Sequence, residues 1–201
     1  MNKKELQMYF SCRLYETLFP EGIFNSGMGQ VVIARITAGG AIVGVTFLCD
    51  HYCLGVKDCL PFLQSEREYK KMIDKLAGPD PLKVVEPGYA KKYLLDLVAW
   101  AKAIGFEPHS DYKFCREILA GIVPDSNATF EFGYQGVPMY MNGPYDTPER
   151  MKAILATLQT YEEKTGNKTH HTLVSESPSL LENITQTLHL PGRRIIQLPS
   201  K

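Results

Sequence analysis

Residues 31–59 read VVIARITAGGAIVGVTFLCDHYCLGVKDC and carry the strongest secondary-structure signal in the chain. Two runs rich in β-branched residues, 31–36 and 41–49, flank the short segment TAGG at 37–40. This pattern predicts two antiparallel strands joined by a tight glycine turn. In the second strand the odd positions form the more apolar face, which consists of Val43, Val45, Phe47 and Cys49. We therefore expect a hairpin with one buried face.

The end of this stretch, LCDHYCLGVKDC at 48–59, places three cysteines, one histidine and two aspartates within twelve positions. Structural zinc sites usually draw their ligands from two knuckles that are well separated in sequence, whereas these candidates are crowded together. Continuing the strand alternation puts His51 and Cys53 on the apolar face, where cysteine behaves as a small hydrophobic residue. The pattern favours buried structural cysteines, and we expect no metal site and no cofactor.

A reactive thiol is the alternative, and Cys53 is the candidate. It lies where an apolar strand gives way to a turn, Gly55 allows close backbone approach, and a nearby Lys57 lowers a thiol pKa. His109 is the candidate base, because it lies in the loop GFEPHSDY between two expected helices. Together with the neighbouring Asp58 these residues form the predicted catalytic site.

The consecutive residues His109, Ser110 and Asp111 resemble a catalytic triad only in their letters, because triad members are assembled from different parts of a fold. Helix capping by Ser110 explains the same letters. Loop carboxylates at Asp50, Asp58, Asp111 and Asp146, with His109, leave a divalent-cation site as a further alternative.

Periodicity and capping signals predict the remaining elements. Helices are expected at 3–19, 65–77, 87–105, 110–121, 147–166 and 178–189; a second hairpin turns at 135–136 within 128–141; further strands are expected at 171–174 and 193–198. Pro138 directs its strand to a sheet edge. The predicted class is α+β, with two β-hairpins packed with about five helices in a single compact unit.

Residues 1–201 are expected to form one domain, with a candidate internal boundary near 77–88. The segment GPDPLKVVEPG at 78–88 carries three prolines and two glycines, which is typical of a linker or a long connection.

The composition excludes several classes of function. Lys plus Arg (22) equals Asp plus Glu (22), so no bulk charge indicates nucleic acid as a partner. No apolar run is long enough to span a membrane, and polar residues interrupt the first twenty positions, so neither a membrane partner nor a secretion signal is expected. Five cysteines without a repeating framework favour reduced thiols in the cytoplasm.

The stretches DHYCLGVKDC, AIGFEPHSDY and FEFGYQGVPMYMNGPYD, together with the preceding hairpin, resemble a group of bacterial proteins with no assigned activity. The resemblance covers roughly residues 30 to 160. It implies a bacterial cytoplasmic protein in which these stretches belong to one unit.

Two classes of function stay open from the sequence. One is a cysteine-dependent hydrolase or transferase that uses Cys53 and His109. The other is a non-catalytic module that binds a protein partner through the edge strand at Pro138 or through tyrosine-bearing loops.

Overall fold

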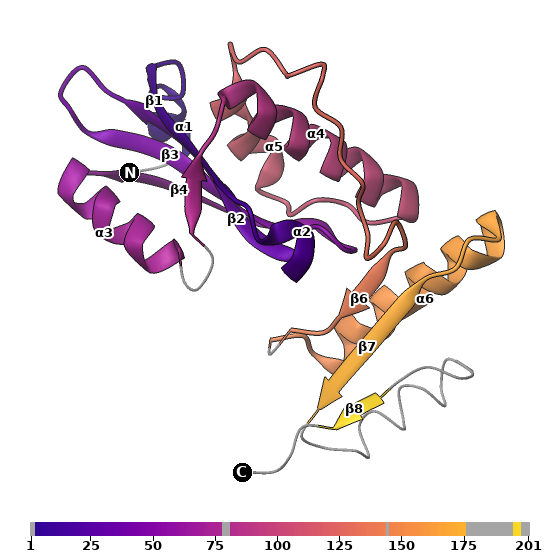
Figure 1. Ribbon diagram of the computed structural model, residues 1–201. Coiled ribbons are helices and arrows are strands. Elements are labelled where there is room, and N and C mark those ends of the chain that lie inside the picture. The colour runs from indigo at the N-terminus through magenta and orange to yellow at the C-terminus, as the bar shows by residue number, and fades with distance from the viewer. Residues whose placement is uncertain (1–2, 78–80, 144, 176–194, 198–201) are drawn as a thin grey trace.

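The computed structural model describes residues 3–77, 81–143, 145–175 and 195–197. Within them the chain forms helices and two β-sheets, so the predicted α+β class is confirmed. The larger sheet has five antiparallel strands in the order β4-β3-β2-β1-β5, and the smaller sheet has the order β6-β7-β8. Figure 1 shows the larger sheet with helix α4 beside it, and the smaller sheet with helix α6 below them.

The hairpin expected at 31–49 is the centre of the larger sheet. Its strands pair without a break from Met28 opposite Asp50 to Ile36 opposite Ile42. The strands of this sheet are β1 (Arg13–Pro20), β2 (Met28–Ile36), β3 (Ile42–Asp50), β4 (Gly55–Gln64) and β5 (Leu82–Val84). The hairpin prediction is therefore confirmed, and the meander continues through residues 51–54 into β4.

The two faces of this sheet are covered by different helices. The odd-numbered residues of β3, which end at Cys49, pack with Leu94 and Leu97 of α4 (Pro87–Ile104). On the opposite face Val32 and Ile42 pack with Tyr69 of α3 (Glu66–Ala77). The alternation read from the sequence thus separates the two cores correctly.

The prediction of a helix at 3–19 is wrong after residue 7. The structure has a short helix α1 (Lys3–Gln7) and then strand β1, which pairs with β2 on one side and β5 on the other. Residues 13–20 read RLYETLFP, in which the apolar positions fit two periods at once. Residues 13–20 form a strand because they pair with β2, and such tertiary contacts override a weak local preference for helix.

Capping signals located three helices correctly. The Ser65 hydroxyl and amide bond to the Glu68 carboxylate, which is the predicted capping box of α3. Helix α4 begins at Pro87 and stops at Gly105, whose φ is 118°. Helix α6 (Pro148–Thr165) begins after Thr147, whose side chain accepts a hydrogen bond from the Arg150 amide.

The second hairpin is not formed. Only an isolated bridge joins Tyr134 and Val137 around the turn. Strand β6 (Met139–Met141) instead pairs in parallel with β7 (His170–Ser175), which pairs in parallel with β8 (Ile195–Gln197). The side chains of Phe130 and Phe132 pack on the aromatic core beside α4, so this segment is held by side-chain burial instead of strand pairing.

The helix expected at 110–121 is shorter than predicted. It consists of α5 (Tyr112–Cys115) and a 3-10 turn over Arg116–Leu119, and its N-cap is Asp111 and not Ser110. Neither the Asp111 side chain nor that of Cys115 caps the backbone of these turns. The carbonyls at the end of this segment are instead held by cationic side chains, as described below.

The remaining expectations concern the connections. The proline-rich segment at 78–88 contains β5, which pairs with β1, and the first residues of α4. A short helix α2 (Ile23–Ser26) precedes β2 and ends at Gly27. Strands expected at 171–174 and 193–198 correspond to β7 and β8, while the helix expected at 178–189 lies outside the described residues.

Candidate functional site

The turn between β3 and β4 is buried, and the Asp50 carboxylate holds it. Its Oδ1 atom accepts hydrogen bonds from the amides of Tyr52 (3.1 Å) and Cys53 (2.9 Å). All of residues 51–54 are buried, and Asp50 itself is only 4% exposed. Burial raises the pKa of Asp50 to about 6, while Lys57 and the turn amides act in the opposite direction. The carboxylate thus satisfies backbone donors that water cannot reach.

Three distant segments bond to the backbone of this same turn. The His51 amide donates to Gly27 O (2.8 Å), the Gly133 amide to His51 O (3.0 Å), and the Met139 amide to Tyr52 O (2.8 Å). Just beyond the turn, the His109 amide donates to Val56 O (2.9 Å). The turn is therefore the junction between the larger sheet, the loop before α5 and the smaller sheet.

Glycine is required at two positions of this junction. Gly55 has a φ of 73°, and a Cβ there would lie 2.6 Å from Ala101 Cβ on α4. Gly27 has a φ of 75°, and a Cβ there would lie 2.2 Å from the ring of Tyr52. A side chain at either place meets both backbone strain and a packed neighbour.

Cys53 is completely buried. Its exposed fraction is 0%, and it belongs to a core cluster with Tyr140, Met151 and Leu155 of the β6 and α6 unit. Burial raises the pKa of the thiol, the Asp50 carboxylate raises it further, and Lys57 lowers it. These conditions favour the protonated thiol over the thiolate, so they favour packing over nucleophilic chemistry.

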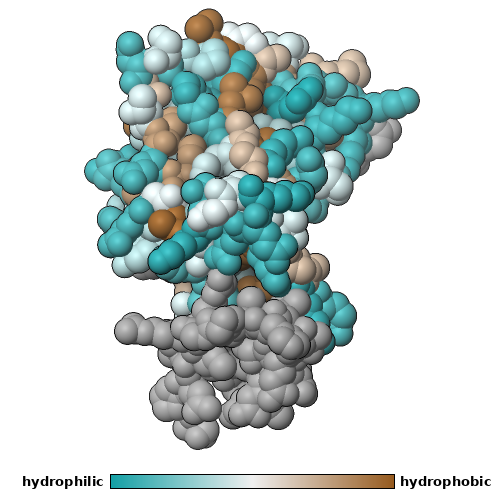
Figure 2. All heavy atoms as spheres, turned by 90° about the vertical axis from the view of Figure 1, so that its right-hand side faces the viewer, coloured by the Kyte–Doolittle hydropathy of each residue, from teal (hydrophilic) through white to brown (hydrophobic). Residues whose placement is uncertain are grey.

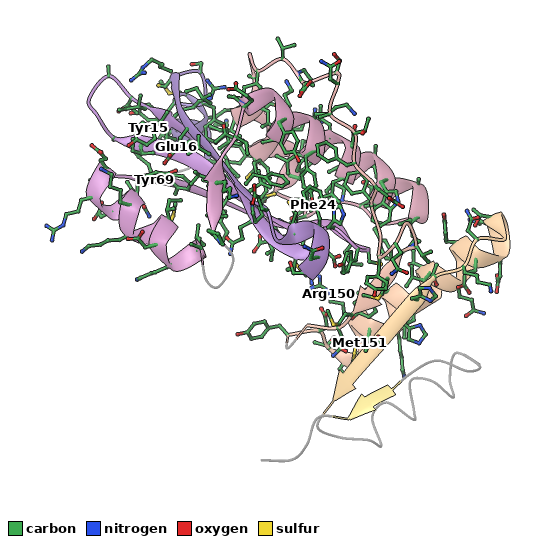
Figure 3. All side chains as sticks on the ribbon, in the orientation of Figure 1. Tyr15, Glu16, Phe24, Tyr69, Arg150 and Met151 are labelled. Carbon is green, nitrogen blue, oxygen red and sulfur yellow. The ribbon has the colours of Figure 1, made fainter. Side chains whose placement is uncertain are left out.

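His51 packs in the cluster of aromatic rings around Tyr93. Its Nδ1 atom lies 3.2 Å from the Tyr93 hydroxyl. Its ring stacks on that of Tyr93, meets that of Phe24 edge to face and is tilted against that of Phe132. Burial lowers the pKa of His51, which keeps the imidazole neutral at pH 7. Figure 3 shows Phe24 at the end of the larger sheet that lies nearer to α6.

His109, Asp58 and Lys57 are brought together. The His109 Nδ1 atom lies 3.7 Å from Asp58 Oδ1 and accepts a hydrogen bond from the Asp111 amide at 3.3 Å. A neutral His109 with this bond carries its proton on Nε2. Lys57 and His109 line one cavity together with Leu54, the residue after Cys53. No hydrogen bond among the described residues joins the Cys53 thiol to His109.

Two cavities flank the His109 loop. One, of about 190 Å³, is lined by Leu54, Val56, Lys57, Phe106, Glu107, His109, Arg150 and Ile154. The other, of about 370 Å³, is lined by Val98, Lys102, Glu107, Pro108, His109, Ser110, Tyr112, Lys113 and Arg116. Glu107 and His109 line both, so the two cavities lie on either side of these residues, and we call the pair the His109 groove. Figure 3 shows Arg150 at the start of α6, between the larger sheet and the smaller one.

More cations than carboxylates line the His109 groove, although the charge of the whole chain is balanced. Its lining contains Lys57, Lys102, Lys113, Arg116 and Arg150 against the single carboxylate of Glu107. Three of these cations also have carboxylate neighbours, in the pairs Lys102–Glu107, Arg116–Glu117 and Arg150–Asp146. The sequence prediction missed four of the five cations, although KAIGFEPHSDYKFCRE at 102–117 carries three of them around one loop.

The other cysteines are also free thiols. Cys49, Cys59 and Cys115 are buried and Cys12 is partly exposed. The thiols of Cys59 and Cys115 are hydrogen-bonded to each other, which lowers the pKa of Cys115. In the described part of the chain no group of three or more His, Cys, Asp or Glu side chains is arranged to hold a metal ion.

Comparisons with known proteins give no relative for this chain. No family model matches it, and neither the curated proteins nor the solved structures contain a significant match. Among the helices of the described residues, none combines the length and the apolar character that crossing a membrane needs. The function has to be inferred from the site itself.

We predict that the effect of Asp50→Asn on the free energy of unfolding depends on pH. The folded pKa of about 6 exceeds the ordinary value of 3.8, so ionisation opposes folding. Stability from this group is complete below pH 3.8 and is lost as the pH rises through 6. An asparagine keeps the acceptor without the charge. The free energy of unfolding of the variant, relative to wild type, should therefore rise by up to about 3 kcal/mol between pH 4 and pH 7 in urea titrations.

Asp50→Ala is the matched control at the same position. It removes the acceptor as well as the charge, so it is expected to be less stable than Asp50→Asn at every pH, by about 1–3 kcal/mol. A difference between Asp50→Asn and wild type that does not change with pH would contradict the assignment.

Proposed function

We propose that this chain binds a small polyanionic molecule, such as a phosphorylated metabolite, in the His109 groove. The observation that supports the proposal is the concentration of five cationic side chains around one loop in a chain with no net charge. Ammonium and guanidinium groups form charge-assisted hydrogen bonds with phosphate oxygens, and the guanidinium does so with two parallel donors. The larger of the two cavities, of about 370 Å³, suits a ligand of metabolite size.

The electrostatics of the groove suit an anion that is partly desolvated. The apolar residues Val98, Phe106 and Ile154 line its walls and lower the local dielectric. His109 contributes an N–H donor from Nε2, because its Nδ1 atom accepts a hydrogen bond. The Asp111 amide donates to Nδ1 and orients this ring.

Loss of two groove cations is predicted to weaken anion binding. The probe is inorganic pyrophosphate, and the variant is Lys113→Gln with Arg116→Gln. Each lost charge-assisted hydrogen bond is expected to cost about 1.5 kcal/mol or more, so the dissociation constant measured by calorimetry at low salt should rise by roughly tenfold or more.

The matched control removes the same charge from another surface. Lys70→Gln with Lys71→Gln changes α3, where both lysines line a shallow hollow on the other face of the larger sheet. This variant should bind pyrophosphate like wild type. Equal weakening in the two double variants would mean a general charge effect, and no weakening in either would contradict the proposal.

A cysteine-dependent reaction at Cys53 and His109 is the second candidate function. It is supported by one observation, that Leu54 next to Cys53 lines the same cavity as His109 and Lys57. The burial of Cys53 and its raised thiol pKa speak against it. Its chemistry requires the side chain of Cys53 to become accessible and to lose its proton.

The rate of iodoacetamide labelling tests this second candidate. Cys53 in the folded chain is expected to react more slowly than the partly exposed Cys12, which serves as the internal control, because its thiol is buried and protonated. Mass spectrometry of peptides after timed labelling measures both rates. Faster labelling of Cys53 than of Cys12 at pH 7 would support the cysteine-dependent reaction and overturn the packing role.

The interaction-module alternative has less support at the Pro138 strand. β6 is an edge strand, as Pro138 led us to expect, but its Met139 amide is already bonded to Tyr52 O. On the side shown in Figure 2 the apolar residues lie in narrow strips among hydrophilic ones and do not form a broad patch. The free thiols of the described cysteines support a reducing compartment such as a bacterial cytoplasm.

A further inference from the structure

Arg35 of β2 is a buried cation outside the His109 groove. Its exposed fraction is 6%. Its Nε and Nη2 donate to Ile118 O at 3.1 and 2.9 Å, Nη1 to Cys12 O at 2.7 Å, and Nη2 also to Ala120 O at 2.6 Å. Every one of these acceptors is a backbone carbonyl. The guanidinium therefore fixes the segment 118–120 against the larger sheet.

The charge of Arg35 has no carboxylate beside it. None of the ion pairs among the described residues includes Arg35. Burial lowers its pKa, and the opposing influence is the Cys12 thiol, not an acidic side chain. Carbonyl dipoles offset part of the cost of burying a cation, but they leave its full unit of charge uncompensated.

Arg35 also lines a cavity of about 500 Å³. The cavity lies between β1, the start of α4 and the loop after the 3-10 turn, and its lining is Ser11, Leu14, Arg35, Pro87, Gly88, Ala120, Gly121, Ile122 and Val123. Most of this lining is apolar, and it carries no acidic residue. A guanidinium has five N–H donors, and the four bonds to carbonyls leave one on Nη1.

A second cation stabilises the wall of this cavity. Lys91 Nζ donates to Leu119 O at 3.1 Å and to Ile122 O at 2.8 Å. Together Arg35 and Lys91 hold four carbonyls of the 118–122 segment, so two side chains of the protein itself fix the cavity wall. A preformed site of this kind spends less free energy on ordering when a ligand binds.

We propose that this cavity binds a small carboxylic acid with an apolar body. The carboxylate neutralises Arg35 and accepts its remaining N–H, and the apolar body packs on Leu14, Pro87 and Ile122. The site shares no lining residue with the His109 groove, so it goes beyond the function proposed above and does not depend on it.

The probes are benzoate and its neutral analogue benzamide. Their binding is measured by the change in NMR chemical shift of the backbone amides of the wild-type chain. Benzoate should shift the amides of residues 118–123 and bind roughly tenfold or more tightly than benzamide, because only the acid neutralises the buried cation. Equal binding of the two probes, or benzoate shifts confined to other residues, would overturn the proposal.

Val123→Asp and Val123→Asn form the matched pair of variants. Val123 is 81% exposed at the cavity mouth, so its replacement leaves the core intact. The aspartate repels an incoming carboxylate and the asparagine does not, so benzoate binding should fall by roughly tenfold only in Val123→Asp. Equal affinity in the two variants would contradict a charge-based site.

Two further experiments distinguish binding of a small acid in this cavity from binding elsewhere and from binding of a peptide end. Lys113→Gln with Arg116→Gln should leave benzoate binding unchanged, and a loss there would assign benzoate to the His109 groove and overturn the proposal. A dipeptide with a free carboxyl end, compared with its amide, tests whether the acid can be the end of a peptide. Preference for benzoate over this dipeptide supports a free small acid, and preference for the dipeptide overturns it.

Discussion

The fold depends on the hydrogen bonds that the Asp50 carboxylate accepts from the amides of the turn after β3. A buried turn leaves backbone donors without water, and an ionisable oxygen inside the protein is a costly but effective acceptor. Because the turn is fixed, its outward-facing amide and carbonyl groups bond to Gly27, Gly133 and Met139. Two sheets with different topologies are thereby joined through one short segment of chain.

The same use of charge recurs elsewhere in the molecule. Asp50 stabilises backbone amides, whereas Arg35 and Lys91 stabilise backbone carbonyls of the 118–122 segment. In each case a charged side chain bonds to backbone groups of a turn or loop outside the β-sheets and the α-helices. The 118–122 segment that lines the Arg35 cavity is thus held by two cationic side chains.

Local sequence signals predicted the elements whose partners are close in the chain. The β2–β3 hairpin, the Ser65–Glu68 capping box and the ends of α4 all depend on neighbouring residues, and they are confirmed. Strand β1 and the segment 128–141 depend on long-range partners, so short apolar runs there were misread. His51 and Cys53 are buried as expected, but not by strand alternation, because they lie in a turn where all of residues 51–54 are buried. Cys53 joins the core of β6 and α6.

The candidate site was predictable only in part for a related reason. His109, Asp58 and Lys57 meet because the loop before α5 bonds to Val56, a contact across some fifty positions of sequence. Nothing local indicates that contact. The cations that line the groove come from β4, α4, α5, the 3-10 turn and α6, and a balanced overall charge gives no sign that they converge.

Native-state hydrogen exchange tests the central role of the turn most directly. In the wild type, the amides of Cys53, Gly133 and Met139 should be protected to a similar degree, because one junction orders all three. In Asp50→Ala their protection should fall together, while that of Val45 in the sheet interior falls less. Unchanged protection of Gly133 and Met139 alongside exposure of Cys53 would contradict the account.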